Sequence, residues 1–62
     1  MMNKFEKIKE LVTNMEADAD KFYEKRNGAA GTRLRASLQT LKVLAQEGRN
    51  EVTEIKNAGK SA

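Results

Sequence analysis

Apolar residues recur at alternating steps of three and four along most of the chain, a spacing that an α-helix turns into one continuous stripe. In the first half this stripe comprises Phe5, Ile8, Val12, Met15, Ala19 and Phe22. In the second half it comprises Leu34, Leu38, Leu41, Ala45, Gly48, Val52, Ile55 and Gly59. Such alternation is the a/d pattern of helices that pack along their length. Because there is no proline and the helix formers Lys, Glu, Leu, Ala and Gln dominate, the sequence predicts an all-α fold.

The two stripes are separated by the stretch RNGAAGTRLR, residues 26–35. Asn27 and Gly28 tolerate left-handed and turn conformations and should stop the first helix, while Ala29 and Ala30 can already belong to the second. Asn3 and Glu6 have the spacing of a capping pair at the start. We therefore expect a single domain over 1–62, with a helix over about 4–26, a turn over about 27–29, a helix over about 30–58 and a frayed tail over 59–62.

A short connection makes neighbouring helices antiparallel, so the two halves should form a helical hairpin. This arrangement places Phe22 near Leu34 and Phe5 near Val52, with both Phe residues in the core. Gly31 either allows the helices to approach closely just past the turn or is a tolerated weak point.

One apolar stripe per helix is a small core for 62 residues, since ordering the backbone costs about 1 to 2 kcal/mol per residue. Leu11 and Leu44 flank their stripes on what should be the same side of the hairpin and widen the apolar face. We therefore expect a homodimer packed as a four-helix bundle, because isologous pairing is the commonest way to bury such a face.

Several function classes are excluded by composition. The chain has no Cys and no His, which removes disulfides, the commonest metal ligands and the usual general base at neutral pH. Asp18 and Asp20 do not face each other on a helix, so we expect no metal site, no cofactor and no enzymatic activity. The apolar runs are too short to span a membrane and the N-terminus lacks a secretory signal, so we expect a cytoplasmic protein.

The net charge of +3 is unevenly distributed. Residues 1–24 carry four Lys and six acidic residues, residues 25–42 carry five basic and no acidic residues, and residues 43–62 carry three of each. If the middle is a turn, the excess positive charge lies at one tip of the molecule, where it attracts polyanions.

The candidate DNA-binding residues are Lys25, Arg26, Arg33, Arg35 and Lys42. No acidic residue lies between Glu24 and Glu47 in the sequence to neutralise them, and the positive end of the second helix dipole points to the same tip. Tyr23 is nearby and is expected to pack against Arg35.

The basic residues Arg35, Lys42, Arg49 and Lys56 repeat every seven positions along the second helix. One interpretation is structural: charges that flank a coiled-coil seam pair with acidic partners, such as Glu16 opposite Lys42. The other is functional: regularly spaced cations follow a phosphate backbone. Both remain open at the level of sequence.

The stretch DADKFYEKRNGAAGTRLRASLQTLKVLAQEGRNEVTEIKN is similar to the short bacterial linker-histone-like proteins known first from chlamydial nucleoids, and the similarity covers about residues 3–58. The helical part of that family carries the signature EK-GN-x-AA-x-x-R-x-R followed by a Leu-rich helix. The positions that match it are Lys25, Asn27, Ala29, Ala30, Arg33 and Arg35, and Arg26 stands in place of its Gly.

The resemblance implies DNA binding and chromosome compaction without strong sequence preference. The chlamydial proteins continue into a Lys/Ala/Pro-rich tail credited with much of the condensation, whereas this sequence stops at NAGKSA. Binding through a few phosphate contacts should then be weak and strongly salt-dependent.

Two functional hypotheses follow. The first is a nucleoid-associated protein that binds DNA nonspecifically through the basic tip, compacting or bridging duplexes if a dimer presents two tips; RNA would satisfy the same charges. The alternative is a helical oligomerisation or adaptor module with no nucleic-acid role. The regular heptads and the nine acidic residues favour this alternative.

Overall fold

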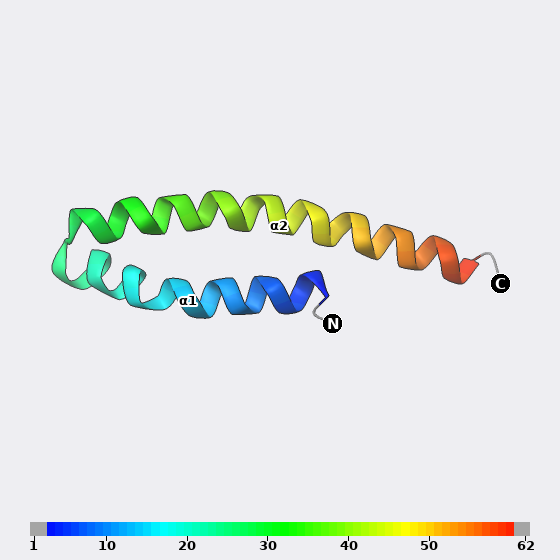
Figure 1. Ribbon diagram of the computed structural model, residues 1–62, viewed down its shortest axis with the longest axis horizontal. Coiled ribbons are helices and arrows are strands. Elements are labelled where there is room, and N and C mark those ends of the chain that lie inside the picture. Colours follow the sequence, from blue (N-terminus) through cyan, green and yellow to red (C-terminus); the bar gives the residue numbers. More distant parts are fainter. Residues whose placement is uncertain (1–2, 61–62) are drawn as a thin grey trace.

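The computed structural model describes residues 3–60, with side chains through residue 59. It consists of two helices, α1 (Lys4–Lys25) and α2 (Gly28–Lys60), which fold back on each other as an antiparallel hairpin (Figure 1). The expected all-α class and helix-on-helix packing are confirmed, and residues 3–60 contain no strand. None of the helices in this range is long and apolar enough to cross a membrane. The residues 61 and 62 of the expected frayed tail lie outside the described range.

The connection is shorter than expected and its chemistry is shifted by one residue. The helices are joined by Arg26 and Asn27 alone, and Arg26 is the residue with left-handed backbone angles, φ 54° and ψ 36°. The Arg26 N–H donates to the Phe22 carbonyl at 3.0 Å, which is the bond of a left-handed helix C-cap. Our assignment of the left-handed conformation to Asn27 and Gly28 was therefore wrong, and Gly28 instead opens α2.

Side-chain amides cap both helices at their start. Asn3 Oδ1 accepts the Glu6 N–H at 2.8 Å, which confirms the expected cap of α1. Asn27 Oδ1 accepts the Ala30 N–H at 3.1 Å, and the Asn27 carbonyl accepts the Gly31 N–H at 3.0 Å. Asn27 therefore stops no helix but caps the second one, directly after the left-handed Arg26.

The two helices meet along seams that share their central positions and Ala19 with the predicted stripes. The central positions are Ile8, Met15 and Phe22 on α1 and Leu34, Leu41 and Gly48 on α2, all buried or half-buried. Beside them the seam takes in Lys4, Leu11, Asp18, Ser37, Leu44 and Glu51. The predicted seam residues Phe5, Val12, Leu38, Val52 and Ile55 are instead 43 to 66% exposed. Both helices are thus turned toward their more polar flank, and Leu11 and Leu44 lie within the seam rather than widening an outer face.

Two ion pairs accompany this rotation, and both cross the seam on the same side of the hairpin. Lys4 Nζ lies 3.2 Å from Glu47 Oε1 near the open end, and Arg33 Nη2 lies 2.9 Å from Asp18 Oδ1 near the turn. The Lys4 N–H also donates to Glu51 at 3.4 Å. We call this side the ion-pair face.

The opposite side of the hairpin carries several exposed apolar residues. Phe5, Ala45 and Val52 line one shallow groove near the open end. Val12 lies seven residues after Phe5, and Leu38 lies seven before Ala45, so helical periodicity puts both on the same side. We call this side the apolar face; its residues are Phe5, Val12, Leu38, Ala45 and Val52.

One predicted close approach is confirmed at Gly31. A Cβ atom placed there would lie 2.6 Å from Phe22 Cδ1, so the ring packs directly on the backbone of α2 just past the turn. The open end is different, since α2 continues well beyond the start of α1 (Figure 1).

Candidate nucleic-acid interface

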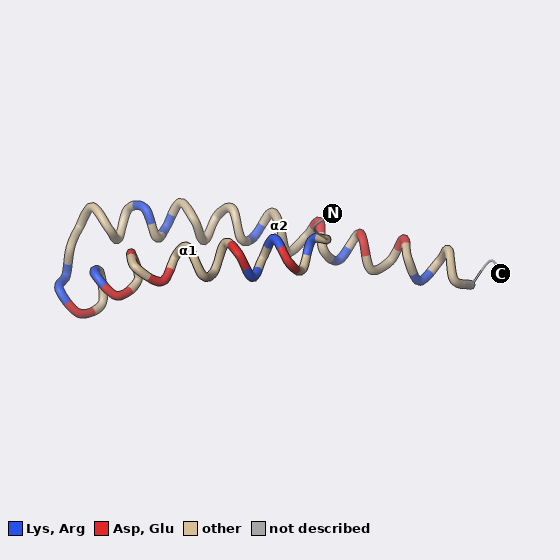
Figure 2. Tube along the Cα trace, turned by 60° about the horizontal axis from the view of Figure 1, so that its bottom comes forward, with Lys and Arg blue, Asp and Glu red and all other residues tan. Residues whose placement is uncertain are grey.

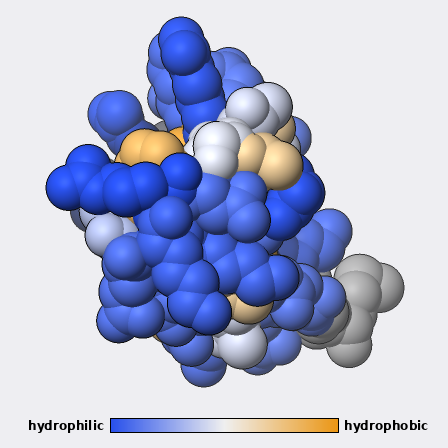
Figure 3. Space-filling view, turned by 90° about the vertical axis from the view of Figure 1, so that its left-hand side faces the viewer, coloured by the Kyte–Doolittle hydropathy of each residue, from blue (hydrophilic) through white to orange (hydrophobic). Residues whose placement is uncertain are grey.

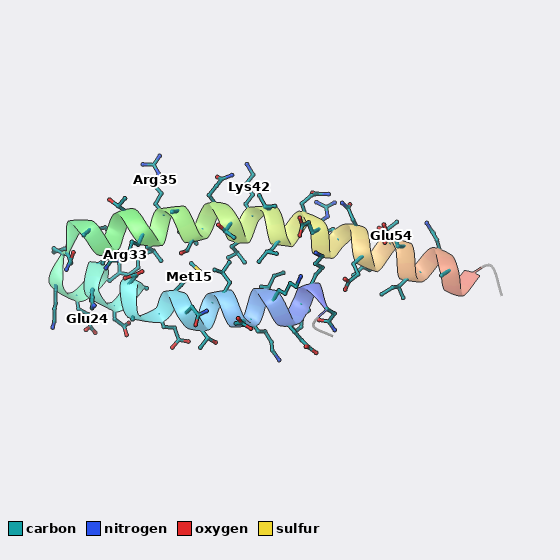
Figure 4. The ribbon with its side chains drawn as sticks, in the orientation of Figure 1. Met15, Glu24, Arg33, Arg35, Lys42 and Glu54 are labelled. Carbon is teal, nitrogen blue, oxygen red and sulfur yellow. The ribbon has the colours of Figure 1, made fainter. Side chains whose placement is uncertain are left out.

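The five candidate DNA-binding residues are all exposed, but they lie in two groups and not on one tip. Lys25 ends α1 and Arg26 forms the cap, so both belong to the turn. Arg35 and Lys42 extend from α2 away from α1 (Figure 4), while Arg33 is directed toward α1.

The seam position determines where the seven-residue basic stripe points. Because α2 contacts α1 through Leu34, Leu41 and Gly48 and through residues on their ion-pair side, the stripe of Arg35, Lys42, Arg49 and Lys56 lies beyond the apolar face, facing water. Arg49 lines the apolar groove, which confirms this placement at one position. We call these four residues the basic ridge.

The predicted pairing of the ridge with acidic residues is absent. Within residues 3–59 the ion pairs are Lys4 with Glu47 and Arg33 with Asp18, so Glu16 does not pair with Lys42. The coiled-coil interpretation assumed that the ridge flanks the seam. It does not, because the seam uses the other flank of α2.

For Arg33, the expectation that no acidic residue neutralises it was wrong. Its Nε and Nη2 atoms both approach Asp18 Oδ1, at 3.0 and 2.9 Å. No acidic residue is near Arg33 in sequence, but the antiparallel return brings α1 alongside. Counting back from the turn along both helices would have predicted an acidic partner near Asp20, one helical turn or less from the observed Asp18.

The same return places negative charge close to the turn. Asp18, Asp20 and Glu24 lie on the last two turns of α1, and Figure 2 shows these acidic segments beside the basic ones at the turn. The end surface seen in Figure 3 is predominantly hydrophilic. The excess positive charge therefore lies on the turn residues and the outward side of α2, rather than over the whole tip.

The first turn of α2 adds a second favourable feature. It contains no acidic residue, although the Ala30 and Gly31 N–H groups already donate to Asn27 and are not free for an anion. The positive end of the helix dipole still lies next to Arg26 and Lys25.

Tyr23 does not make the predicted contact. Its ring packs edge-on against Phe22, with centroids 5.3 Å apart and an interplanar angle of 71°, and it does not stack on Arg35. The side chain is 70% exposed beside the turn. The other predicted core ring, Phe5, is exposed and lies under the Lys9 ammonium at 5.7 Å.

The family comparison agrees with the resemblance noted in the sequence. A family model described as histone H1-like protein Hc1 matches residues 2–58. No curated protein and no solved structure gives a significant match.

Proposed function

The chain belongs to the Hc1 family of histone H1-like proteins, and from this premise we propose that it is a nucleoid-associated protein that binds DNA without sequence preference. The family indicates a structural role on DNA in the cytoplasmic nucleoid rather than catalysis. We further propose Lys25, Arg26, Arg33, Arg35 and Lys42 as the DNA-binding residues.

The observation that carries this proposal is the basic ridge of α2. Among residues 3–59, its four cations have no acidic partner and face water on the side of α2 that α1 does not cover. Successive ridge residues are seven positions apart, or about 10 Å along the helix. Long cationic side chains at regular intervals suit a phosphate backbone and read no base sequence.

The second part of the proposal is a homodimer that assembles as a four-helix bundle. A dimer has two basic turns and two ridges, so one assembly can hold two duplex segments and compact or bridge DNA. RNA carries the same backbone charge and is a further candidate ligand, and no membrane partner is proposed.

The exposed apolar face favours a second candidate function. A helical oligomerisation or adaptor module with no nucleic-acid role would use that face for another helical protein, and the ridge would then serve solubility. The two functions differ in what the ridge does, so the experiment must change the ridge alone.

The test compares two double variants with the same loss of charge. Arg35→Gln with Lys42→Gln removes two ridge cations, and Lys7→Gln with Lys9→Gln removes two exposed cations of α1 that lie among Glu6 and Glu10. Affinity for two unrelated duplexes is measured by fluorescence anisotropy at several salt concentrations.

We expect the ridge variant to weaken binding to both duplexes equally and to make the slope of log affinity against log salt shallower by up to about 1.8, which corresponds to two phosphate contacts. The α1 variant should have a smaller effect. Equal effects of the two variants would mean that only net charge matters. If the unmodified chain does not bind either duplex at low salt, DNA binding is refuted and the adaptor function replaces it.

A further inference from the structure

The hairpin exposes more surface than a folded chain of its mass. The accessible surface is 5151 Å², whereas a compact monomer of 6.9 kDa is expected to expose about 4,000 Å². The excess is of the order of the roughly 800 Å² that one partner contributes to a stable protein interface. Only Met15, Ala30 and Leu34 are buried among the residues with described side chains. An excess of this size is what a second copy of the hairpin would cover in a stable dimer.

Two pairs of the uncovered apolar residues, Phe5 with Val12 and Leu38 with Val52, are spaced symmetrically on their helices. On α2, Ala45 lies midway between Leu38 and Val52. On α1, the point midway between Phe5 and Val12 falls between Ile8 and Lys9.

These two midpoints lie at the same height along the hairpin. Phe22 packs on Gly31, and Lys4 contacts both Glu47 and Glu51, so one step forward on α1 corresponds to one step back on α2. Counted this way, the α1 midpoint lies beside Ala45. It follows that one axis through this height relates both apolar pairs.

We propose that a second copy covers the apolar face through a two-fold axis at Ala45, perpendicular to the helices, so that the two turns point to opposite ends. This inference rests on the homodimer of the proposed function and adds its geometry. Phe5 then lies over Val12 of the second copy, and Leu38 lies over Val52 of the second copy. The alternative two-fold axis, parallel to the helices, would place both turns at the same end.

The length of α2 favours this orientation. α2 runs from Gly28 to Lys60, so its middle lies one residue from the proposed axis and it pairs with its copy over its whole length. The part beyond α1, with Val52 and Ile55 at 57% and 65% exposure, then packs on the turn half of the other hairpin. With both turns at one end, nothing would cover this part.

The charges of the turns favour this orientation, whereas those of the two ridges, which come side by side, do not. Lys25 and Arg26 of the two copies are kept far apart, whereas turns at a common end would bring these like charges together. α2 lies over α2, so the two ridges run along one side of the bundle, with Lys42 near Arg49 of the second copy. That side becomes one basic edge which ends in a basic turn at each end.

The test is the distance between the two turns. The chain has no Cys, and a Cβ atom at Gly28 would meet no atom within 4 Å, so Gly28→Cys can carry a nitroxide label without disturbing the turn. Double electron–electron resonance should give a single distance between the two labels of about 50 Å, from 17 residues on each side of the axis and the rise of 1.5 Å per residue. A distance under about 30 Å would place the turns together and overturn the proposal, as would a monomer with no dipolar signal.

A second variant pair reports the axis itself. Ala45→Cys should be joined into a covalent dimer by a short bismaleimide, whereas Ala36→Cys, on the exposed side of α2, should not. Equal cross-linking of the two would contradict the axis. Duplex binding is measured on the same proteins: a long turn-to-turn distance without binding would support the dimer geometry and refute the DNA-binding function, and binding with a short distance would do the reverse.

Discussion

Arg26 gives the sharpest test of the turn, because its charge and its backbone conformation affect different properties. Its backbone is left-handed at φ 54° and ψ 36°, where Gly avoids the steric cost that a Cβ atom imposes. That cost is about 1 to 2 kcal/mol, and the greater freedom of Gly in the unfolded chain offsets about 0.5 to 1 kcal/mol of it. Arg26→Gly should therefore stabilise the chain by about 0.5 to 1 kcal/mol.

The matched control is Arg26→Ala, which removes the same charge but keeps the Cβ atom. The Arg26 side chain is exposed and makes no ion pair within residues 3–59, so losing it should change stability little. Thermal unfolding followed by circular dichroism, at equal chain concentration, should show the Gly variant melting a few degrees above the Ala variant. Both variants should lose the same amount of DNA affinity. Identical melting temperatures for the two would refute the assignment of strain to this residue.

Two further predictions concern the seam. Asp18→Asn frees Arg33 and should strengthen duplex binding and steepen the salt slope by up to about 0.9. Asp20→Asn removes the same charge from an exposed position and should change the affinity less. Equal effects of the two variants in an anisotropy titration would count against this pairing. Gly31→Ala would force a methyl group into the Phe22 ring and should lower the free energy of unfolding by about 1 to 2 kcal/mol. Gly48→Ala meets only contacts at 3.8 Å and should raise it by up to about 1 kcal/mol through helix propensity. Urea unfolding in which both variants shift the stability in the same direction would contradict the packing.

The sequence predicted the parts of the fold that depend on local chemistry. Asn3 has a side chain that caps a helix, and Gly31 has no side chain to keep a neighbouring ring away, so both roles follow from residue type. The helices and their antiparallel return follow from periodicity and the short connection. The left-handed residue was misplaced because Gly and Asn prefer that conformation, while here the cap of α2 requires Asn27 and leaves the conformation to Arg26.

The choice of flank could not be predicted from hydrophobicity. On each helix the central stripe has a more apolar flank and a more polar one, and apolar burial alone favours the flank with Phe5 and Val52. The structure uses the other flank, where Lys4 and Arg33 find acidic partners across the seam. Those partners are distant in sequence, and the direction of the ridge depends on which flank packs. The residues of the ridge could therefore be predicted from the sequence, but the side of the hairpin on which they lie could not.

The central claim is that the turn and the ridge of α2 hold the phosphate backbone, and nuclear magnetic resonance titration tests it most directly. A ¹⁵N-labelled chain is titrated with a short duplex at low salt, and amide shifts are followed for each residue. The account predicts the largest changes around Lys25, Arg26, Arg35 and Lys42, unchanged by the duplex sequence, with little change around Lys7. Changes centred on the start of α1, or no change at any residue, would contradict it.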